Sequence, residues 1–309
     1  MNAIYFDSTH DEAARRERLY NGQLFVFSPR ASTRALCDFA RRMLEEAFGA
    51  LDPRQAQHSL PVEEFAAIVA PLKTNFIHHP KSLELMQSIV RELGCDPAKT
   101  YIDVPRLRIA TSHGYLTSGV AYAHHPHRDT WYSAPMSQLN WWLPIYEYES
   151  ESGMAFHPRY WSQAVRNSSS EFNYYEWNSV GRKNAAQHVK TDTRKQPKAQ
   201  EPVELDPQVR IVSSVGGLTI FSAAHLHSTV PNTTGQTRYS IDFRTVHLDD
   251  VLQMGGAPNV DSAPTGTSLR DFMRGTDLSR LPEEVVARYD GAAPVDGELV
   301  FQPVTAGAR

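Results

Sequence analysis

The sequence predicts an α+β protein in which the helices come first and the strands follow. Two observations support this fold class. Through the first hundred residues, apolar side chains recur at the three- and four-residue spacing of amphipathic helices. From residue 100 to 248, that spacing gives way to short β-branched and aromatic runs separated by turn-forming residues, which is typical of strands. We therefore expect a mainly helical part over residues 1–100 and a β-rich core over residues 100–248.

The helical part has its clearest example in residues 32–48. The apolar side chains of this stretch fall on one face, and Gly49 directly follows the last of them, as glycine does where helices end. Before it, the run NGQLFVFSP combines a turn signal with a short apolar strand that Pro29 ends. The expected helices are residues 11–20, 32–48, 62–71 and 81–94.

Within the β-rich core, alternation is clearest in YIDVPRLRIATS. Leu107 and Ile109 share one face of this strand, whereas Arg106 and Arg108 share the other. Three more runs have strand character. They are residues 137–148, 209–232 and 237–248.

Two further segments lack a regular pattern. Residues 162–208 are polar, which predicts a long exposed insert; a structureless loop of that length inside a domain is usually functional or disordered. The tail from Gly255 is rich in glycine and proline, with one helix-like stretch, SLRDFMRG. We expect residues 1–309 to form a single domain, with residues 249–309 as a C-terminal extension.

The overall composition excludes several classes of protein. The chain has 309 residues, 41% hydrophobic and 21% charged, which is typical of a globular protein that can bury a sizeable core. Its net charge of −4 predicts no general attraction to nucleic acid or anionic lipid. The sequence has no apolar run that could span a membrane, and its first twenty residues lack the apolar centre of a signal peptide. Cys37 and Cys95 are too few for a disulfide framework or a thiolate metal cage, so we expect a cytoplasmic protein.

The candidate chemistry begins in AYAHHPHRDTWYSAP, residues 121–135. Residues two apart in a strand point to the same side, so His127 and Asp129 can reach one point while Arg128 faces away. A third metal ligand must come from elsewhere. The best candidates are His225 and His227 in HLHSTVPNTTGQTRYS, which share a strand face, so that either could serve. Two histidines and one carboxylate are the metal ligands of non-haem Fe(II) oxygenases, which leave the other coordination positions open.

In this arrangement, the chain resembles the phytanoyl-CoA dioxygenase-like branch of the Fe(II)/2-oxoglutarate-dependent oxygenases. The resemblance covers residues 15–250 and includes the strand and helix of NGQLFVF and the residues after it. It implies a double-stranded β-helix core, the cupin-like jelly roll, with an α-helical N-terminal layer packed on it. Two groups of residues carry the resemblance. The first is His127-Arg128-Asp129. The second is His227, followed eleven residues later by Arg238, with Pro231-Asn232 between them and an Arg-x-Ser motif from Arg238 to Ser240.

The resemblance implies Fe(II) bound by His127, Asp129 and His227, with 2-oxoglutarate as co-substrate and ascorbate as a stimulant of activity. The eleven-residue spacing to Arg238 favours His227 over His225 as the third ligand.

Arg238 and Ser240 lie two apart, so both face one side of a strand, and relatives use this pair to hold the far carboxylate of 2-oxoglutarate. A guanidinium suits a bidentate hold on a carboxylate, and an arginine buried without an anion would be costly. The alternative is a structural acid, such as Asp242 or Asp103, as the partner of Arg238.

Several other residues are weaker candidates, and each has a structural alternative: a packed strand, an exposed strand end, a solvated charge or a pinned surface loop. The candidates are Gln138 and Asn140 for 2-oxoglutarate, and Trp131, Trp142, His125, Arg108 and Tyr175 for the substrate pocket.

The implied reaction is hydroxylation of an unactivated C–H bond in a small polar metabolite or natural-product intermediate. It is coupled to the decarboxylation of 2-oxoglutarate by dioxygen, which yields succinate and CO2. Asp129 disfavours halogenation, because halogenating relatives usually replace this carboxylate; desaturation, ring closure, epoxidation and a carrier-linked substrate stay open. The alternatives are a cupin-like metal protein that does not use 2-oxoglutarate, or a non-catalytic binding protein on the same barrel. We expect small-molecule partners, no nucleic acid and no membrane, for a monomer or a homodimer.

Overall fold

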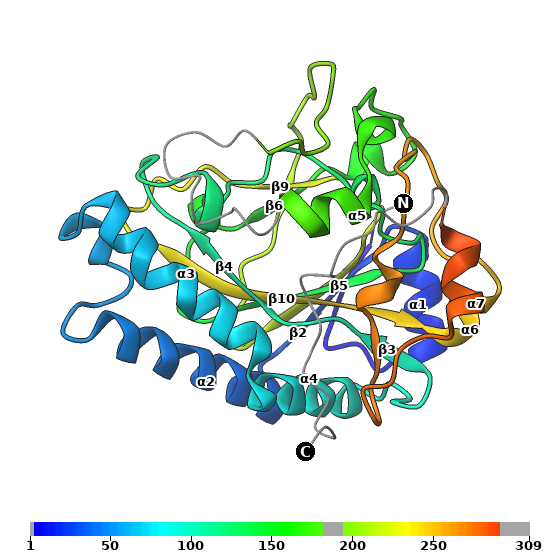
Figure 1. The fold of residues 1–309 in the computed structure, drawn as a ribbon, viewed down its shortest axis with the longest axis horizontal. Coiled ribbons are helices and arrows are strands. Elements are labelled where there is room, and N and C mark those ends of the chain that lie inside the picture. The colour runs from blue at the N-terminus through cyan, green and yellow to red at the C-terminus, as the bar shows by residue number, and fades with distance from the viewer. Residues whose placement is uncertain (1–2, 182–193, 291–309) are drawn as a thin grey trace.

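The computed structural model describes residues 3–181 and 194–290, and it confirms a mixed α+β protein with a sheet-rich core. Two sheets face one another (Figure 1). The larger sheet has the strand order β1-β2-β8-β5-β10-β3-β11, with β4 also paired to β10, and the smaller sheet has the order β7-β6-β9. The strands of the larger sheet are β1 (Ile4–Phe6), β2 (Leu24–Phe27), β3 (Thr100–Ile102), β4 (Arg106–Ala110), β5 (Leu139–Pro144), β8 (Leu218–Ser222), β10 (Arg238–His247) and β11 (Met273–Arg274). The strands of the smaller sheet are β6 (Met154–Phe156), β7 (Val209–Arg210) and β9 (His227–Thr229).

The central strands of the larger sheet have one apolar face and one charged face, because side chains alternate along each strand. β10 pairs antiparallel with β4 and β5, which places Ile241 beside Leu107 and Leu143 in the main apolar core. On the other face, Asp242 lies opposite Arg106. The alternation predicted for β4 is therefore confirmed, and the charged face is turned toward the smaller sheet.

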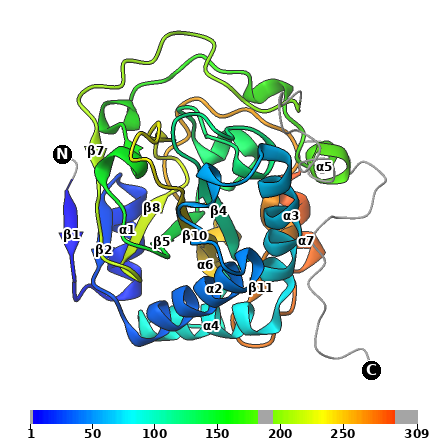
Figure 2. The same cartoon turned by 90° about the vertical axis from the view of Figure 1, so that its left-hand side faces the viewer.

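Helices cover the apolar face of the larger sheet (Figure 2). α2 (Ala31–Phe48), α3 (Val62–His78) and α4 (Pro80–Glu92) contribute their buried stripes to the same core cluster as the strands. α1 (Glu12–Tyr20) lies against β8 and β2. Within residues 3–181 and 194–290, no helix is long and apolar enough to cross a bilayer.

The structure corrects one helix boundary. The sequence pattern predicts an end at residue 71, but α3 continues through Pro71 to His78. Pro71 lacks an N–H group and cannot complete the helical hydrogen bond at its position. Leu72 and Phe76 nevertheless extend the buried stripe of α3, and the burial of an apolar face stabilises a helix more than intrinsic propensity does.

Segments from both ends of the described chain complete the larger sheet. β1 runs parallel to β2 at one edge, and β11, from the C-terminal extension, pairs with β3 at the other. The stretch SLRDFMRG does not form the predicted helix; it makes a 3-10 turn (Ser268–Asp271) followed by β11. Up to residue 290, where the described C-terminal part ends, its α-helices are α6 (Leu248–Leu252) and α7 (Glu283–Val286).

The insert at residues 162–208 is more buried than its composition predicts. Its short helix α5 (Tyr174–Glu176) holds Tyr174 and Tyr175, both of which are 3% exposed. Asn167 and Ala199 form an antiparallel bridge that joins the two sides of the insert. Residues 182–193 of the insert lie outside the described residues. The described ends of the insert therefore pack onto the protein body.

Candidate metal centre

The backbone brings the two halves of the predicted site together. His127 and His227 exchange both backbone hydrogen bonds, each with an N–O distance of 3.0 Å, as an antiparallel bridge at the edge of β9. The predicted strand ends there, because Asp129 begins a 3-10 turn (Asp129–Tyr132). Arg128 itself is extended, with φ −109° and ψ 143°. That conformation still directs the side chains of His127 and Asp129 to one side and Arg128 to the other.

His127, Asp129 and His227 form a group that can hold a metal ion, since one ligand atom from each lies within 4.8 Å of the others. Asp129 Oδ1 is 3.3 Å from His127 Nε2 and 3.8 Å from His227 Nε2. Both imidazoles are buried, at 5% and 7% exposed. Two imidazole nitrogens and one carboxylate oxygen therefore converge on one point.

Hydrogen bonds at the other ring nitrogens orient both imidazoles. His127 Nδ1 donates to the His125 carbonyl at 2.7 Å, and His227 Nδ1 donates to the His225 carbonyl at 2.9 Å. Because a carbonyl only accepts, the proton must be on Nδ1 in each ring. Nε2 then keeps its lone pair and faces Asp129, which is the tautomer that a metal-binding histidine needs. Burial, together with the nearby His127, lowers the pKa of His227 to about 3, which keeps its ring neutral.

The second oxygen of Asp129 is held by three side chains. Oδ2 accepts from Asn140 Nδ2 at 3.0 Å and from Gln138 Nε2 at 3.4 Å, and it lies 3.7 Å from Arg244 Nε. Burial opposes the ionisation of Asp129, but its polar contacts in the site, the positive charge of Arg244 among them, hold its pKa well below the usual value. Gln138 and Asn140, the two amides predicted to contact 2-oxoglutarate, also bond to each other and thus form one cluster with the Asp129 carboxylate.

His225 lies outside this group, although it is only two residues from His227. Its Nε2 bonds to the Gly22 carbonyl at 3.0 Å, and its ring packs against Phe156 and Trp161. His225 is fully buried, and burial lowers its pKa to about 4. The structure therefore groups His227, and not His225, with His127 and Asp129.

Arg238 is buried without an acidic partner among the described residues. Its Nη1 donates to Ser240 Oγ at 2.6 Å, its guanidinium lies 5.5 Å from the centre of the Trp142 ring, and its Nε has no hydrogen-bond partner. Burial lowers the pKa of Arg238 to about 10, which still leaves it charged at neutral pH. A buried cation with an unused donor points to an anion that binds there.

The two acids that could have paired with Arg238 are taken by other arginines. Asp242 accepts from Arg108 Nε at 2.5 Å and lies 3.4 Å from Arg244 Nη2. Asp103 pairs with Arg106 and, at 3.3 Å, with Arg244. The structural alternative for Arg238 is thus absent from the described residues, and Arg108, predicted to meet substrate, has a carboxylate of its own.

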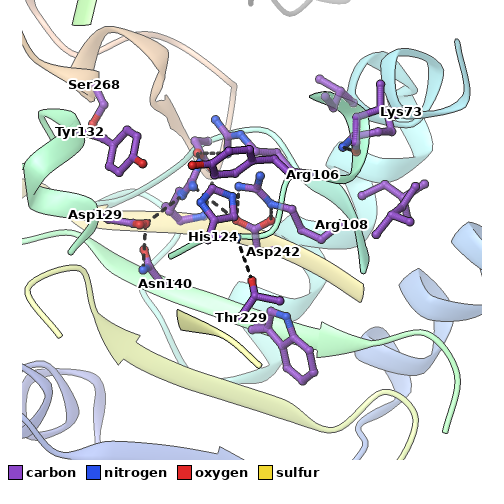
Figure 3. Close-up of a pocket in the computed structure, with 18 of the residues that line it drawn as sticks. Lys73, Arg106, Arg108, His124, Asp129, Tyr132, Asn140, Thr229, Asp242 and Ser268 are labelled. Atoms are coloured by element: carbon purple, nitrogen blue, oxygen red, sulfur yellow. Dashed lines mark hydrogen bonds and ion pairs between the residues drawn. The ribbon is translucent and has the colours of Figure 1, made fainter. Parts of the chain in front are cut away.

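A cavity of about 750 Å³ contains this site, and it lies between the two sheets and α3 (Figure 3). The cavity is lined by the three candidate metal ligands. Five other predicted site residues also line it: Arg238, Trp142, Arg108, Gln138 and Asn140. Ser240 is fully buried behind Arg238 and is not among the lining residues.

Three predicted pocket residues lie elsewhere. Trp131 is fully buried and donates from Nε1 to Asp261 at 2.7 Å, because the 3-10 turn rotates it away from the cavity. His125 is exposed and contributes its carbonyl to His127. Tyr175 packs inside the insert, where its hydroxyl bonds with Asp290 and Arg270.

Several residues that line the cavity were not predicted from the sequence, among them His124, Tyr132, Lys73 and Arg244. Arg244 was detectable, because it shares strand parity with Arg238, Ser240 and Asp242 on β10. His124 stacks on His127 with ring centres 4.9 Å apart, and this contact depends on the loop conformation before the bridge. No pattern in the sequence places Lys73 of α3 in the cavity.

No family model matches the chain, and no curated protein matches it. Similar solved structures include EvdO2 from Micromonospora carbonacea var. aurantiaca, with a TM-score of 0.43 and 14% identity over 79% of this chain and 93% of that one. The epimerase SnoN, in complex with Fe3+, alpha ketoglutarate and nogalamycin RO, has a TM-score of 0.37 and 17% identity over 83% of this chain and 98% of that one. The non-heme monooxygenase ThoJ has a TM-score of 0.37 and 15% identity over 82% and 79%. At these scores and identities, the likeness carries no argument about function.

Proposed function

We propose that this protein is a non-haem Fe(II)- and 2-oxoglutarate-dependent dioxygenase of the phytanoyl-CoA dioxygenase-like branch, which hydroxylates an unactivated C–H bond of a small metabolite. One observation carries the proposal: the buried group of His127, Asp129 and His227 shares a cavity with a buried arginine, Arg238, that has no acid partner among the described residues. The first feature suits a divalent metal, and the second suits a carboxylate.

The donor set fits Fe(II). Two neutral imidazoles and one carboxylate on one side of an ion leave room for exogenous ligands, which is the arrangement of non-haem Fe(II) oxygenases. His127 and His227 would bind through Nε2, and Asp129 through Oδ1, since its Oδ2 is already held by Asn140 and Arg244. When bound, the iron would supply the oxidative chemistry with dioxygen, whereas the chain's own residues set its ligands.

The buried arginine fits 2-oxoglutarate. Arg238 would hold the far carboxylate, with Ser240 Oγ fixing one guanidinium nitrogen and the Trp142 ring supporting the guanidinium plane. The unused Nε is a donor that the co-substrate can satisfy. Gln138 and Asn140 would act on the co-substrate only indirectly, by orienting Asp129.

The proposal also includes the architecture. We propose that the two facing sheets are the double-stranded β-helix of this superfamily, with α2 to α4 as its helical layer. The chain would then work as one domain, because the N-terminal and C-terminal segments both contribute strands to the larger sheet.

The test is succinate formation from 2-oxoglutarate by the purified protein with Fe(II) and ascorbate under air. We expect turnover in the wild type and its loss in Asp129→Ala, because one of three metal ligands is removed. Asp38→Ala is the matched control, since Asp38 is an exposed residue of α2. Absence of succinate from the fully iron-loaded wild type, or equal turnover in Asp129→Ala, would refute the proposed function.

A further inference from the structure

The cavity extends well beyond the metal centre. Figure 3 shows Lys73 of α3 on the side of the cavity away from Asp129, with Arg108 between them. A volume of about 750 Å³ lies in the upper part of the range of ~300–1,000 Å³ typical of small-molecule sites. A small dicarboxylate at Arg238 would leave the end of the cavity at α3 free for a second ligand.

Lys73 is half-buried at this end of the cavity and has no ion pair with any residue in the described ranges. Its Nζ donates to the carbonyl of Val120 at 2.5 Å, which leaves its other two N–H donors available. Burial, with the positive charge of Arg108, lowers the pKa of Lys73 to about 7. A lysine in such a position costs free energy unless an anion joins it.

The charge of the cavity lining is unbalanced. Among the described residues that line it, six are lysine or arginine and four are aspartate. Asp103, Asp129 and Asp242 are engaged by Arg106, Arg108 and Arg244. A divalent metal and a dianionic co-substrate would cancel each other, so the cationic excess would persist in the loaded site.

The surroundings of Lys73 are otherwise mixed. Ile77, one helical turn from Lys73 on α3, and Val120 give the cavity wall apolar surface, and Trp177 adds an aromatic face that Arg194 covers at 5.3 Å. Arg194 also lowers the pKa of Lys73, so its positive charge is felt at the amine. The site thus offers a cationic end next to apolar walls.

We propose that the substrate is an organic oxyanion, a carboxylate or a phosphate with an apolar body, and that Lys73 binds its anionic group. Lys73 would be a specificity-determining residue: it would anchor the substrate at α3, so that the apolar body lies toward the metal centre. This inference rests on the proposed function for its orientation, and it adds the chemical class of the substrate.

The test measures binding without turnover. The wild type is saturated with Mn(II) and 2-oxoglutarate under nitrogen and titrated calorimetrically with three matched pairs of probes: phenylacetate and phenylacetamide, hexanoate and hexanamide, and phenyl phosphate and phenol. We expect at least one anion to bind at least tenfold more tightly than its neutral partner. We expect Lys73→Met to remove that preference and Lys73→Arg to keep it.

Control variants separate the two proposals. Lys81→Met, at an exposed lysine of α4 paired with Glu84, should bind the anion as the wild type does. Arg238→Met should lose 2-oxoglutarate and keep the anion preference, whereas Lys73→Met should keep 2-oxoglutarate. If no anion is preferred in the wild type, or if Lys73→Met keeps the preference, the substrate class is wrong. If 2-oxoglutarate fails to bind the wild type while the Lys73-dependent preference persists, the proposed function fails and the anion site stands.

Discussion

At the scale of single residues, His225 and His227 show how the backbone decides which of two like side chains takes part in a site. Both are buried histidines, but only His227 lies in the bridge to His127 and has a ring nitrogen near Asp129. His225 supplies a carbonyl to its neighbour and places its own ring against Phe156. Sequence parity alone cannot separate them, because the turn before β9 changes the direction of the side chains.

We predict that His227→Ala weakens Mn(II) binding more than His225→Ala does. The loss of a direct ligand should exceed the ~10–100-fold effect typical of residues that only support a ligand. His225→Ala should instead lower the melting temperature, because it empties a packed site. Calorimetric titration with Mn(II) and a thermal melt of each variant measure the two effects, and the reverse order of metal affinities would contradict the assignment.

Asn140 makes a different contribution, because it contacts Asp129, a candidate metal ligand, and would not bind the metal itself. Its amide holds Asp129 Oδ2 at 3.0 Å. We predict that Asn140→Leu, which keeps the volume and removes the donor, weakens Mn(II) binding by ~10–100-fold. Asn75→Leu, at an exposed residue that lines the far end of the same cavity, is the control. Unchanged metal affinity in Asn140→Leu would show that Arg244 alone suffices to orient the carboxylate.

The titration of Lys73 should make the affinity for an anionic probe fall as the pH rises. Its pKa of about 7 means that the amine is charged below neutral pH and loses its proton above it. Arg108 and Arg194 lower this pKa and Asp242 raises it, and arginine and a paired aspartate keep their charges through this range. Affinity for a carboxylate probe should therefore fall as pH rises from 6 to 8.5, approaching about tenfold per unit above the pKa.

The control for this prediction is Lys73→Arg, whose guanidinium stays charged throughout and whose probe affinity should stay constant with pH. Phenylacetate is the suitable probe, because its own carboxyl group remains ionised. The same slope in the wild type and in Lys73→Arg would assign the titration to another group.

At the scale of elements, Arg128 joins the metal-binding segment to three distant segments of the chain. Although it stands between His127 and Asp129, its side chain points away from them and is 1% exposed. Its Nε bonds Asp261, and its terminal nitrogens donate to the carbonyls of Ala224, Tyr160 and Gln163. Asp261 also accepts from Trp131 and from the backbone of Val165. This cluster locks the turn that directs Asp129 toward the two histidines.

We predict that Arg128→Met destabilises the protein by about 3–5 kcal/mol, because it leaves Asp261 as a buried charge without its cation. Urea denaturation followed by fluorescence measures the free energy of unfolding. Arg159→Met, which breaks the exposed pair with Glu204, should cost less than about 1 kcal/mol. Equal losses in the two variants would contradict a structural role for the Arg128 cluster.

The helices and strands also show how far the local sequence pattern predicts strand faces and helix ends. Alternation in β4 correctly separated Leu107 and Ile109, which join the apolar core, from Arg106 and Arg108, which carry the charged face. It could not predict that α3 would continue through Pro71, because burial of Leu72 and Phe76 depends on the sheet beneath them. Likewise, SLRDFMRG became a 3-10 turn and a strand because β3 offers an edge to pair with.

At the scale of the whole molecule, the site depends on contacts between parts that are far apart in the sequence. The metal group joins residues near position 127 to residue 227, and the cavity is closed by α3 from the N-terminal part. The order and spacing of motifs predicted which residues could meet. The pairing of Asp103 and Asp242 with other arginines, which leaves Arg238 for an anion, required the register of β4 against β10.

The central claim is that the metal group and Arg238 together bind 2-oxoglutarate, and calorimetric titration of 2-oxoglutarate into the Mn(II)-loaded protein under nitrogen tests it most directly. We predict that omitting Mn(II) or introducing Arg238→Met weakens binding by about tenfold or more, since a hydrogen bond to a charged group contributes about 1.5–3 kcal/mol. Arg41→Met, at a more exposed residue of α2, should bind as the wild type does. Binding that is equally tight without the metal, or in Arg238→Met, would contradict the account.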